Sequence, residues 1–184
     1  PKRKESDCDC FDTGHSSTSI SAGIGLVAAR DLQDGDEHVI SVIGDGALTG
    51  GMAYEALNNA SRLKRNFIII LNDNNMSIAE NVGGMSEYLN GLRTNEAYTN
   101  FKTGVEQSLS RIPGGSHLAN QLKKTKSGIK QLFIPGMLFE NMGITYLGPV
   151  DGHDIGKLQD ILNKAKKVKG AVLVHVLTRK GNGY

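Results

Sequence analysis

The stretch SVIGDGALTGG, residues 41–51, decides the fold class of this chain. It begins inside an apolar run, residues 39–43, whose β-branched side chains predict a buried strand. The run stops at Gly44, and a single carboxylate, Asp45, follows with a second glycine on its far side. A chain that places one acid between two glycines at the end of a buried strand presents that acid to a ligand or to the start of the next element.

A second apolar run, NFIIILN at residues 66–72, predicts the next buried strand, and the pattern between the two runs favours a helix over residues 50–63. Two strands that are apolar throughout, joined by a helix, are typical of a parallel sheet with both faces covered. Another helix is expected at residues 16–32, before the first strand.

The same alternation resumes near the end of the chain, with strands expected at residues 144–147 and 171–178 and a helix between them. The sequence therefore predicts one α/β domain of 184 residues, a parallel sheet flanked by helices. Residues 84–133 interrupt the alternation with polar helical patterns at 96–111 and 116–132, and we expect them to be a helical insertion that covers the site.

Composition excludes several classes of function. The net charge is only +2 and the basic residues are scattered, so we expect no nucleic-acid partner. The sequence has neither an apolar run of membrane-spanning length nor a signal peptide, so no membrane partner is expected. The polar start and the end directly after a strand indicate a domain truncated at both ends.

Polar side chains follow both predicted strands of the first unit. Asp45 comes after one strand and Asn74 after the next, and neighbouring strands lie about 4.8 Å apart, so the two side chains should converge. A carboxylate and an amide oxygen suit Mg²⁺, and a backbone carbonyl near Met76 could supply a third ligand. The alternatives are ordinary: Asp45 could cap the following helix, and Asn74 could be a turn residue.

The glycines at residues 46–51 would let backbone N–H groups at a helix start approach a phosphate group. Two better-known phosphate motifs do not match this stretch. A dinucleotide fingerprint would need glycine in place of Thr49, and a P-loop would need a lysine after the glycines. The pattern therefore indicates a metal-binding site beside a binding site for a diphosphate group.

A GDG triplet followed by a double asparagine, Asn74 and Asn75, resembles the thiamine diphosphate signature of transketolase-like enzymes. Longer blocks resemble one family among them, the 1-deoxy-D-xylulose-5-phosphate synthases. They cover residues 14–184 and read GHSSTSISAGIGLVAARDL, GDGALTGGMAYEALNNA, ILNDNNMSIAENVG, LFENMGITYLGPVDGHD and KGNGY. The resemblance implies a thiamine diphosphate-binding fold.

The resemblance also implies a function. Members of this family are transferases that condense pyruvate with D-glyceraldehyde 3-phosphate and release CO₂, with thiamine diphosphate and Mg²⁺ as cofactors. The product feeds isoprenoid (terpenoid), thiamine and pyridoxal biosynthesis. The expected assembly is a homodimer of the full-length enzyme, in the bacterial cytoplasm or the plastid stroma.

The resemblance also implies which residues of this chain form the site, at the positions that match the family's motifs. The metal ligands would be Asp45, Asn74 and Met76. The cofactor contacts would be Gly14, His15, Ser16, Gly46, Ala47, Asn74 and Tyr184, and His15 would also be catalytic as a proton carrier. The family's pyrimidine-binding domain, with the glutamate that activates the cofactor, has no counterpart in these residues, so we expect the 184-residue chain alone to be inactive.

Several alternatives stay open at this stage. His15 could be an ordinary loop histidine, Tyr184 a frayed chain end, and the DGHD stretch at residues 151–154 a turn with a helix cap. The protein could be another transketolase-like enzyme, or the chain could be a truncated fragment that binds Mg²⁺ and diphosphate without catalysis.

Overall fold

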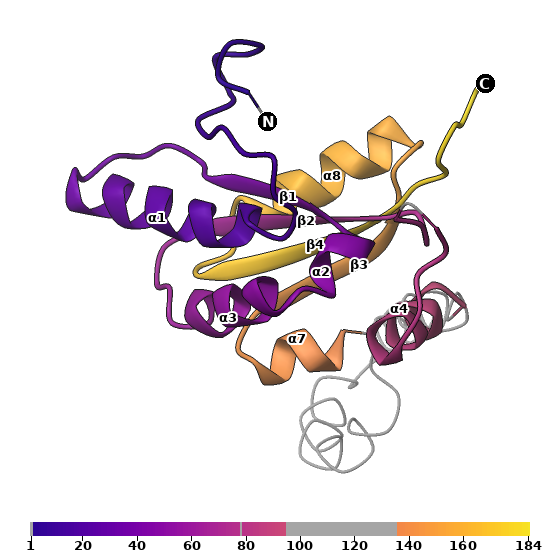
Figure 1. The fold of residues 1–184 in the computed structure, drawn as a ribbon. Helices are drawn as coiled ribbons and strands as arrows, with labels where there is room; N and C mark the ends of the chain where they lie inside the picture. The colour runs from indigo at the N-terminus through magenta and orange to yellow at the C-terminus, as the bar shows by residue number, and fades with distance from the viewer. Residues whose placement is uncertain (1, 78, 95–135) are drawn as a thin grey trace, which may run out of the picture.

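A parallel sheet forms the centre of the protein. The structure is a computed structural model that describes residues 2–77, 79–94 and 136–184. In the described residues the sheet has four strands in the order β1-β2-β4-β3 (Figure 1). The strands are β1 Ile40–Gly44, β2 Phe67–Asp73, β3 Thr145–Asp151 and β4 Ala171–Leu177. All four predicted strands are present, with ends shifted by up to four residues. The expectation that the first strand is buried was wrong for one face, because β1 lies at the edge of the described sheet and exposes Ile40 (47%) and Val42 (58%).

Helices cover both faces of the sheet (Figure 1). They are α1 Ser19–Leu32, α2 Asp45–Leu48, α3 Gly51–Ala60, α4 Gly84–Thr94, α7 Met137–Asn141 and α8 Ile155–Ala165. Side chains of α1, α3, α4 and α7 share one hydrophobic core with the sheet, and α8 packs on the opposite face. The fold class predicted from the sequence, a parallel α/β sheet flanked by helices, is confirmed.

Some predicted boundaries were wrong. The first helix starts at Ser19 rather than residue 16, because Ser17 has a left-handed backbone (φ 66°) that a helix cannot include. Helix α2 was not predicted, since its four residues look like a glycine-rich loop in the sequence. Of the predicted insertion at 84–133 only α4 lies in the described residues; the helices expected at 96–111 and 116–132 lie outside them.

The two inner strands explain the apolar runs of the sequence. Strands β2 and β4 each have neighbours on both sides, and alternate residues point into the two cores. Phe67 and Ile69 join the α1–α3 core, whereas Ile68 packs beneath α8. A strand buried on both faces cannot alternate with polar residues, which is why periodicity predicted these two strands well.

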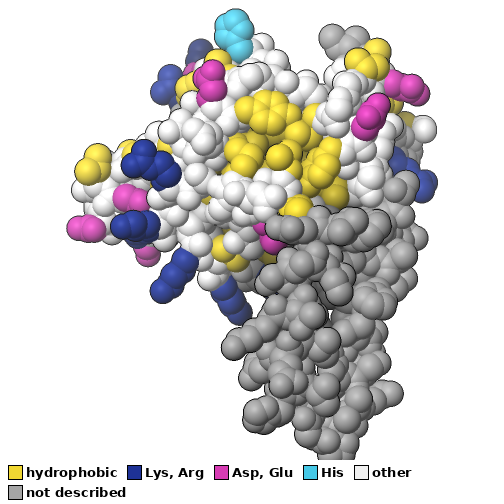
Figure 2. Space-filling view, turned by 90° about the horizontal axis from the view of Figure 1, so that it is seen from below, with side chains coloured by type: hydrophobic (Ala, Val, Ile, Leu, Met, Phe, Trp, Pro, Cys, Tyr) yellow, Lys and Arg dark blue, Asp and Glu magenta, His cyan; other side chains and the backbone are white. Residues whose placement is uncertain are grey.

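Hydrophobic side chains also reach the surface. In the view from below (Figure 2), a group of them gathers near the middle of the face that is seen. On the helices at the lower side of Figure 1, Met52 of α3 is 49% exposed and Leu138 of α7 is 36% exposed. No helix among the described residues combines the length and the apolar character needed to cross a membrane.

Close packing of α1 on the sheet gives a test of the fold. A Cβ atom at Gly23 would lie 2.2 Å from Ser41 Oγ and 2.7 Å from the ring of Phe67. Gly23→Ala should therefore lower the free energy of unfolding by about 1–3 kcal/mol, the usual cost of overpacking. The matched control is Gly25→Ala in the same helix, where a Cβ meets nothing within 4 Å. Gly25→Ala should raise the free energy of unfolding by about 0.5–1 kcal/mol, because alanine favours a helix more than glycine does. Urea unfolding of the two variants measures this, and equal effects would contradict the described packing.

Candidate functional site

The register of β1 on β2 brings the candidate residues to one edge of the sheet. The parallel pairing sets Gly44 opposite Asn72. The next residues along the two strands are Asp45 and Asp73, and Asn74 follows directly. Strand β1 ends where Gly44 keeps an extended backbone (ψ 155°) as the N-cap of α2, so the chain turns into the helix at Asp45. The predicted adjacency of the first two strands is confirmed.

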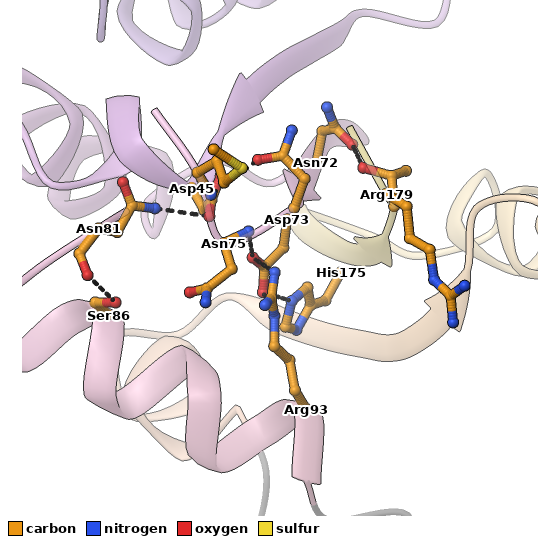
Figure 3. Close-up of polar contacts among 12 residues, drawn as sticks. Asp45, Asn72, Asp73, Asn75, Asn81, Ser86, Arg93, His175 and Arg179 are labelled. Carbon is orange, nitrogen blue, oxygen red and sulfur yellow. Dashed lines mark hydrogen bonds and ion pairs between the residues drawn. The ribbon is translucent and has the colours of Figure 1, made fainter. Parts of the chain in front are cut away.

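Asp45 is a buried carboxylate, only 2% exposed. Asn81 donates from Nδ2 to its Oδ2 at 2.7 Å (Figure 3). Burial raises the pKa of Asp45, and the neighbouring Asp73 carboxylate raises it further. Within the part of the chain that the structure describes, no Lys, Arg or His lies within 4.0 Å of its carboxylate oxygens. A buried carboxylate that lacks a protein cation fits a bound cation.

The loop after β2 has a defined shape. The backbone N–H of Met76 donates to Asn74 Oδ1 at 3.0 Å, which keeps the Asn74 amide beside the Met76 backbone. Asn75 between them has a left-handed backbone (φ 61°). Lys180 donates from Nζ to the carbonyl of Ser77 at 3.1 Å and joins the loop to the chain beyond β4. A strained non-glycine conformation of this kind persists only where surrounding contacts hold it.

The ligand types at this edge fit Mg²⁺ rather than a softer metal. Among residues 2–77, 79–94 and 136–184, no three His, Cys, Asp or Glu side chains gather as a metal cluster. A cation here would therefore bind the Asp45 carboxylate together with amide and carbonyl oxygens of the 74–76 loop. Mg²⁺ accepts such a set, because it keeps several water or phosphate ligands.

The stretch before α1 lies against α2. Ser17 donates from Oγ to the carbonyl of Ala47 at 2.6 Å. A Cβ atom at Gly50 would lie 2.4 Å from the same Oγ, so the glycine is needed for this approach. Gly14, His15 and Ser16 precede this contact and are exposed to solvent. This contact attaches the segment that follows residues 14–16 to Ala47, one of the predicted cofactor residues. The roles of residues 14–16 stay predictions.

Tyr184 is not brought to this group. Its backbone N–H bonds to the carbonyl of Gly181 at 3.1 Å, but its side chain is fully exposed at the chain end. The side chain therefore packs against none of the other predicted site residues in this structure. His15 makes a backbone hydrogen bond to Thr13 Oγ1 at 3.1 Å, and its ring is exposed. Their expected roles stay predictions.

Sequence reasoning missed a buried polar network next to this edge. Asp73 is 1% exposed and His175 is 0% exposed. Asp73 Oδ2 lies 2.8 Å from His175 Nε2 and accepts from Arg93 Nε at 2.8 Å (Figure 3). Tyr146 Oη lies 2.7 Å from His175 Nδ1. The available signal was one histidine inside an otherwise apolar strand, AVLVHVL.

The protonation states in this network follow from its contacts. Burial raises the pKa of Tyr146 well above its usual range, so the hydroxyl stays protonated and donates to His175 Nδ1. The ring then carries its proton on Nε2 and donates to Asp73. Burial alone would raise the pKa of Asp73, but the hydrogen bonds from His175 and Arg93 outweigh it and hold that pKa well below its usual range.

Comparison with known proteins decides the family. The sequence profile of 1-deoxy-D-xylulose-5-phosphate synthase matches residues 1–178. The chain belongs to the 1-deoxy-D-xylulose-5-phosphate synthase family. It is 62% identical, over its whole length, to the 1-deoxy-D-xylulose-5-phosphate synthase of Lachnoclostridium phytofermentans. The chain spans only 30% of that relative.

Solved structures place the synthase family's N-terminal region in a wider fold. The chain aligns over 90% of its length with 20% of the transketolase from Campylobacter jejuni, at 25% identity and a TM-score of 0.57. It also aligns over 91% of its length with 23% of an enzyme from Mycobacterium smegmatis described as thiamin diphosphate-dependent (15% identity, TM-score 0.52). The predicted thiamine diphosphate-binding fold is confirmed.

The DGHD stretch of this synthase-family chain serves two structural purposes. Asp154 caps α8 by accepting from the backbone N–H of Lys157 at 3.0 Å, as the turn-and-cap alternative expects. His153 accepts the backbone N–H of Arg179 on Nε2 at 3.0 Å. Both His153 and Asn74 border a pocket of about 720 Å³ at the carboxyl ends of β2, β3 and β4. The stretch therefore also faces the candidate site.

Gly46 gives a test of the site's geometry in this synthase-family domain. An added Cβ would lie 2.6 Å from Ser77 Cβ and 3.1 Å from Asn81 Oδ1, the residue that holds Asp45. Gly46→Ala should weaken Mg²⁺-dependent binding of thiamine diphosphate by about 10–100-fold, as loss of outer-shell support commonly does. Gly84→Ala, where a Cβ meets nothing within 4 Å, is the control and should bind normally. Calorimetric titration distinguishes the two, and unaltered binding by Gly46→Ala would refute the close approach.

Proposed function

We propose that the protein containing this chain is a 1-deoxy-D-xylulose-5-phosphate synthase. In this proposal it condenses pyruvate with D-glyceraldehyde 3-phosphate, with loss of CO₂, and requires thiamine diphosphate and Mg²⁺. The observation that carries the proposal is the buried carboxylate of Asp45, without a protein cation among the described residues, beside Asn74 in a chain of this family. Because the chain spans 30% of its relative, the activity is proposed for the longer protein.

The chain's own residues would bind and orient the cofactor. Asp45, the Asn74 amide oxygen and the carbonyl of Met76 would hold Mg²⁺, which in turn would neutralise the diphosphate. The proposed cofactor contacts are Gly14, His15, Ser16, Gly46, Ala47, Asn74 and Tyr184. The thiazolium ring of the bound cofactor supplies the electron sink that decarboxylation requires.

His15 is proposed as the residue of this chain that moves a proton at the site. Its ring is exposed on the segment that Ser17 attaches to Ala47, so it is free to face a bound substrate. An imidazole has one nitrogen that can accept a proton and one that can donate it, which suits proton transfer to a substrate oxygen. We further propose that the full-length enzyme is a homodimer located in the bacterial cytoplasm or the plastid stroma.

The test is an assay of the full-length protein with pyruvate, D-glyceraldehyde 3-phosphate, Mg²⁺ and thiamine diphosphate. The expected result is stoichiometric release of CO₂ and formation of deoxyxylulose phosphate, with no turnover by the 184-residue chain alone. A ketose phosphate offered in place of pyruvate tests the transketolase alternative, to which the structural likeness to the Campylobacter jejuni enzyme lends support. Turnover of the ketose phosphate without use of pyruvate would overturn the proposal.

A further inference from the structure

The buried carboxylate of Asp73 lies one residue before Asn74, yet none of the predicted ligand roles uses it. We infer that Asp73 is a positioning residue that fixes the 74–76 loop in the shape that binds Mg²⁺. This inference rests on the proposed function, because it assumes that Asn74 and the carbonyl of Met76 are metal ligands. It assigns to Asp73 no direct contact with the metal.

The contacts of Asp73 reach the loop on one side. Its Oδ1 accepts the backbone N–H of Asn75 at 3.2 Å. That bond holds Asn75 in the left-handed conformation (φ 61°) that turns the chain back so that Met76 N–H reaches Asn74 Oδ1 at 3.0 Å. The orientation of the Asn74 amide therefore depends on the orientation of the Asp73 carboxylate.

On the other side, the carboxylate is held by two elements distant in the sequence. Arg93 at the end of α4 donates to both oxygens of Asp73, through Nε to Oδ2 at 2.8 Å and through a second nitrogen to Oδ1. His175 in β4 donates from Nε2 to Oδ2 at 2.8 Å. A bidentate guanidinium fixes the plane of a carboxylate, and the histidine fixes its rotation.

The histidine is itself fixed from behind. Tyr146 Oη lies 2.7 Å from His175 Nδ1, and the Tyr146 ring stacks on Phe139 with an interplanar angle of 4° and a centroid distance of 6.1 Å. The chain Tyr146–His175–Asp73 thus connects the hydrophobic core to the candidate metal loop. This is the arrangement by which outer-shell groups orient metal ligands.

The direct contacts also argue against Asp73 as a metal ligand. Its two oxygens already accept from Asn75, Arg93 and His175. Asp45 in contrast accepts one side-chain bond, from Asn81. Asp45 also accepts backbone hydrogen bonds from Asp45 and Gly46, but it has fewer side-chain partners than Asp73. Of the two neighbouring carboxylates, Asp45 is therefore the better placed to bind a cation, and Asp73 has the contacts of a supporting residue.

Asp73→Asn tests this assignment. A carboxamide offers one acceptor oxygen in place of two, so its NH₂ group must face a donor, either Asn75 N–H or the Arg93 and His175 pair. The full-length protein, titrated with Mg²⁺ at saturating thiamine diphosphate, should show a Kd for Mg²⁺ raised about 10–100-fold. High Mg²⁺ should restore most of kcat, so the effect should appear in the Mg²⁺ requirement.

Two further variants keep the test decisive. Arg93→Gln changes a partly exposed side chain that the fold should tolerate, and it should raise the Kd for Mg²⁺ by up to about tenfold. Tyr88→Phe is the control: its hydroxyl accepts from Leu138 N at 3.1 Å in the same aromatic group but does not contact Asp73, and its Kd should not change.

A merely structural role would lower the melting temperature of Asp73→Asn while the folded protein binds Mg²⁺ as tightly as the wild type. That result would overturn the inference. If Asp73→Asn does not fold, an unchanged Kd for Mg²⁺ in Arg93→Gln would overturn it instead. Absence of Mg²⁺-dependent cofactor binding by the wild type would instead overturn the proposed function, and the inference with it.

Discussion

Asp45→Asn is expected to weaken Mg²⁺-dependent binding of thiamine diphosphate by about 10²–10³-fold. The substitution keeps the size and polarity of the side chain but removes the charge that would balance the cation. Loss of one member of a buried charge pair typically costs 3–5 kcal/mol, and each 1.4 kcal/mol is tenfold in affinity. Calorimetric titration of the full-length protein with cofactor, with and without Mg²⁺, measures the change.

The same variant should be more stable than the wild type in the absence of Mg²⁺. Burial and the nearby Asp73 make the ionised Asp45 side chain unfavourable in the metal-free protein, as its raised pKa indicates. Asp154→Asn provides the control, because Asp154 is a partly exposed N-cap far from the candidate metal ligands in the sequence, and asparagine caps a helix about as well. Weaker binding in Asp154→Asn, or tight binding in Asp45→Asn, would show that the metal lies elsewhere.

His175→Ala is expected to lower the free energy of unfolding by about 3–5 kcal/mol. The ring is fully buried, and its removal leaves the Asp73 carboxylate with one fewer donor and the Tyr146 hydroxyl without its acceptor. A domain of this size has only about 5–15 kcal/mol of stability in total, so the loss is a large fraction. Equilibrium urea unfolding is the measurement.

Tyr146→Phe serves as the graded control for that prediction. It keeps the ring that stacks on Phe139 and removes only the hydroxyl, so the loss should be about 1–3 kcal/mol, the cost of one unsatisfied buried acceptor. Equal losses of unfolding free energy in the two variants would mean that the Asp73–His175 contact contributes nothing to stability. A negligible loss in His175→Ala would contradict the buried network altogether.

The sequence predicted the features that depend on local pattern. The apolar run at residues 66–72 corresponds to β2, because a strand buried on both faces leaves a continuous apolar signal. The run at 39–43 corresponds to β1, which is apolar too, although its residues Ile40 and Val42 are exposed on one face. The carboxyl ends of neighbouring parallel strands lie at the same edge of a sheet, which predicts that Asp45 and Asn74 lie close together. The register of β1 on β2 supports that prediction.

The features that the sequence did not predict depend on pairing between distant segments. The position of β4 between β2 and β3 follows from long-range strand pairing, which no local pattern encodes. The Asp73–His175 contact spans 102 residues and exists only because these two strands are neighbours. Asp73 has no distinguishing signal in the sequence LNDNN, because the adjacent asparagines carry the recognisable motif.

The most direct test of the proposed site is the position of the metal itself. Crystals of the full-length protein, grown with thiamine diphosphate and with Mn²⁺ in place of Mg²⁺, would locate the ion by its anomalous scattering. We predict one peak about 2.0–2.3 Å from an Asp45 carboxylate oxygen and from Asn74 Oδ1, with the carbonyl of Met76 as a further ligand. A bound cofactor whose metal ion touches neither Asp45 nor Asn74 would contradict the account.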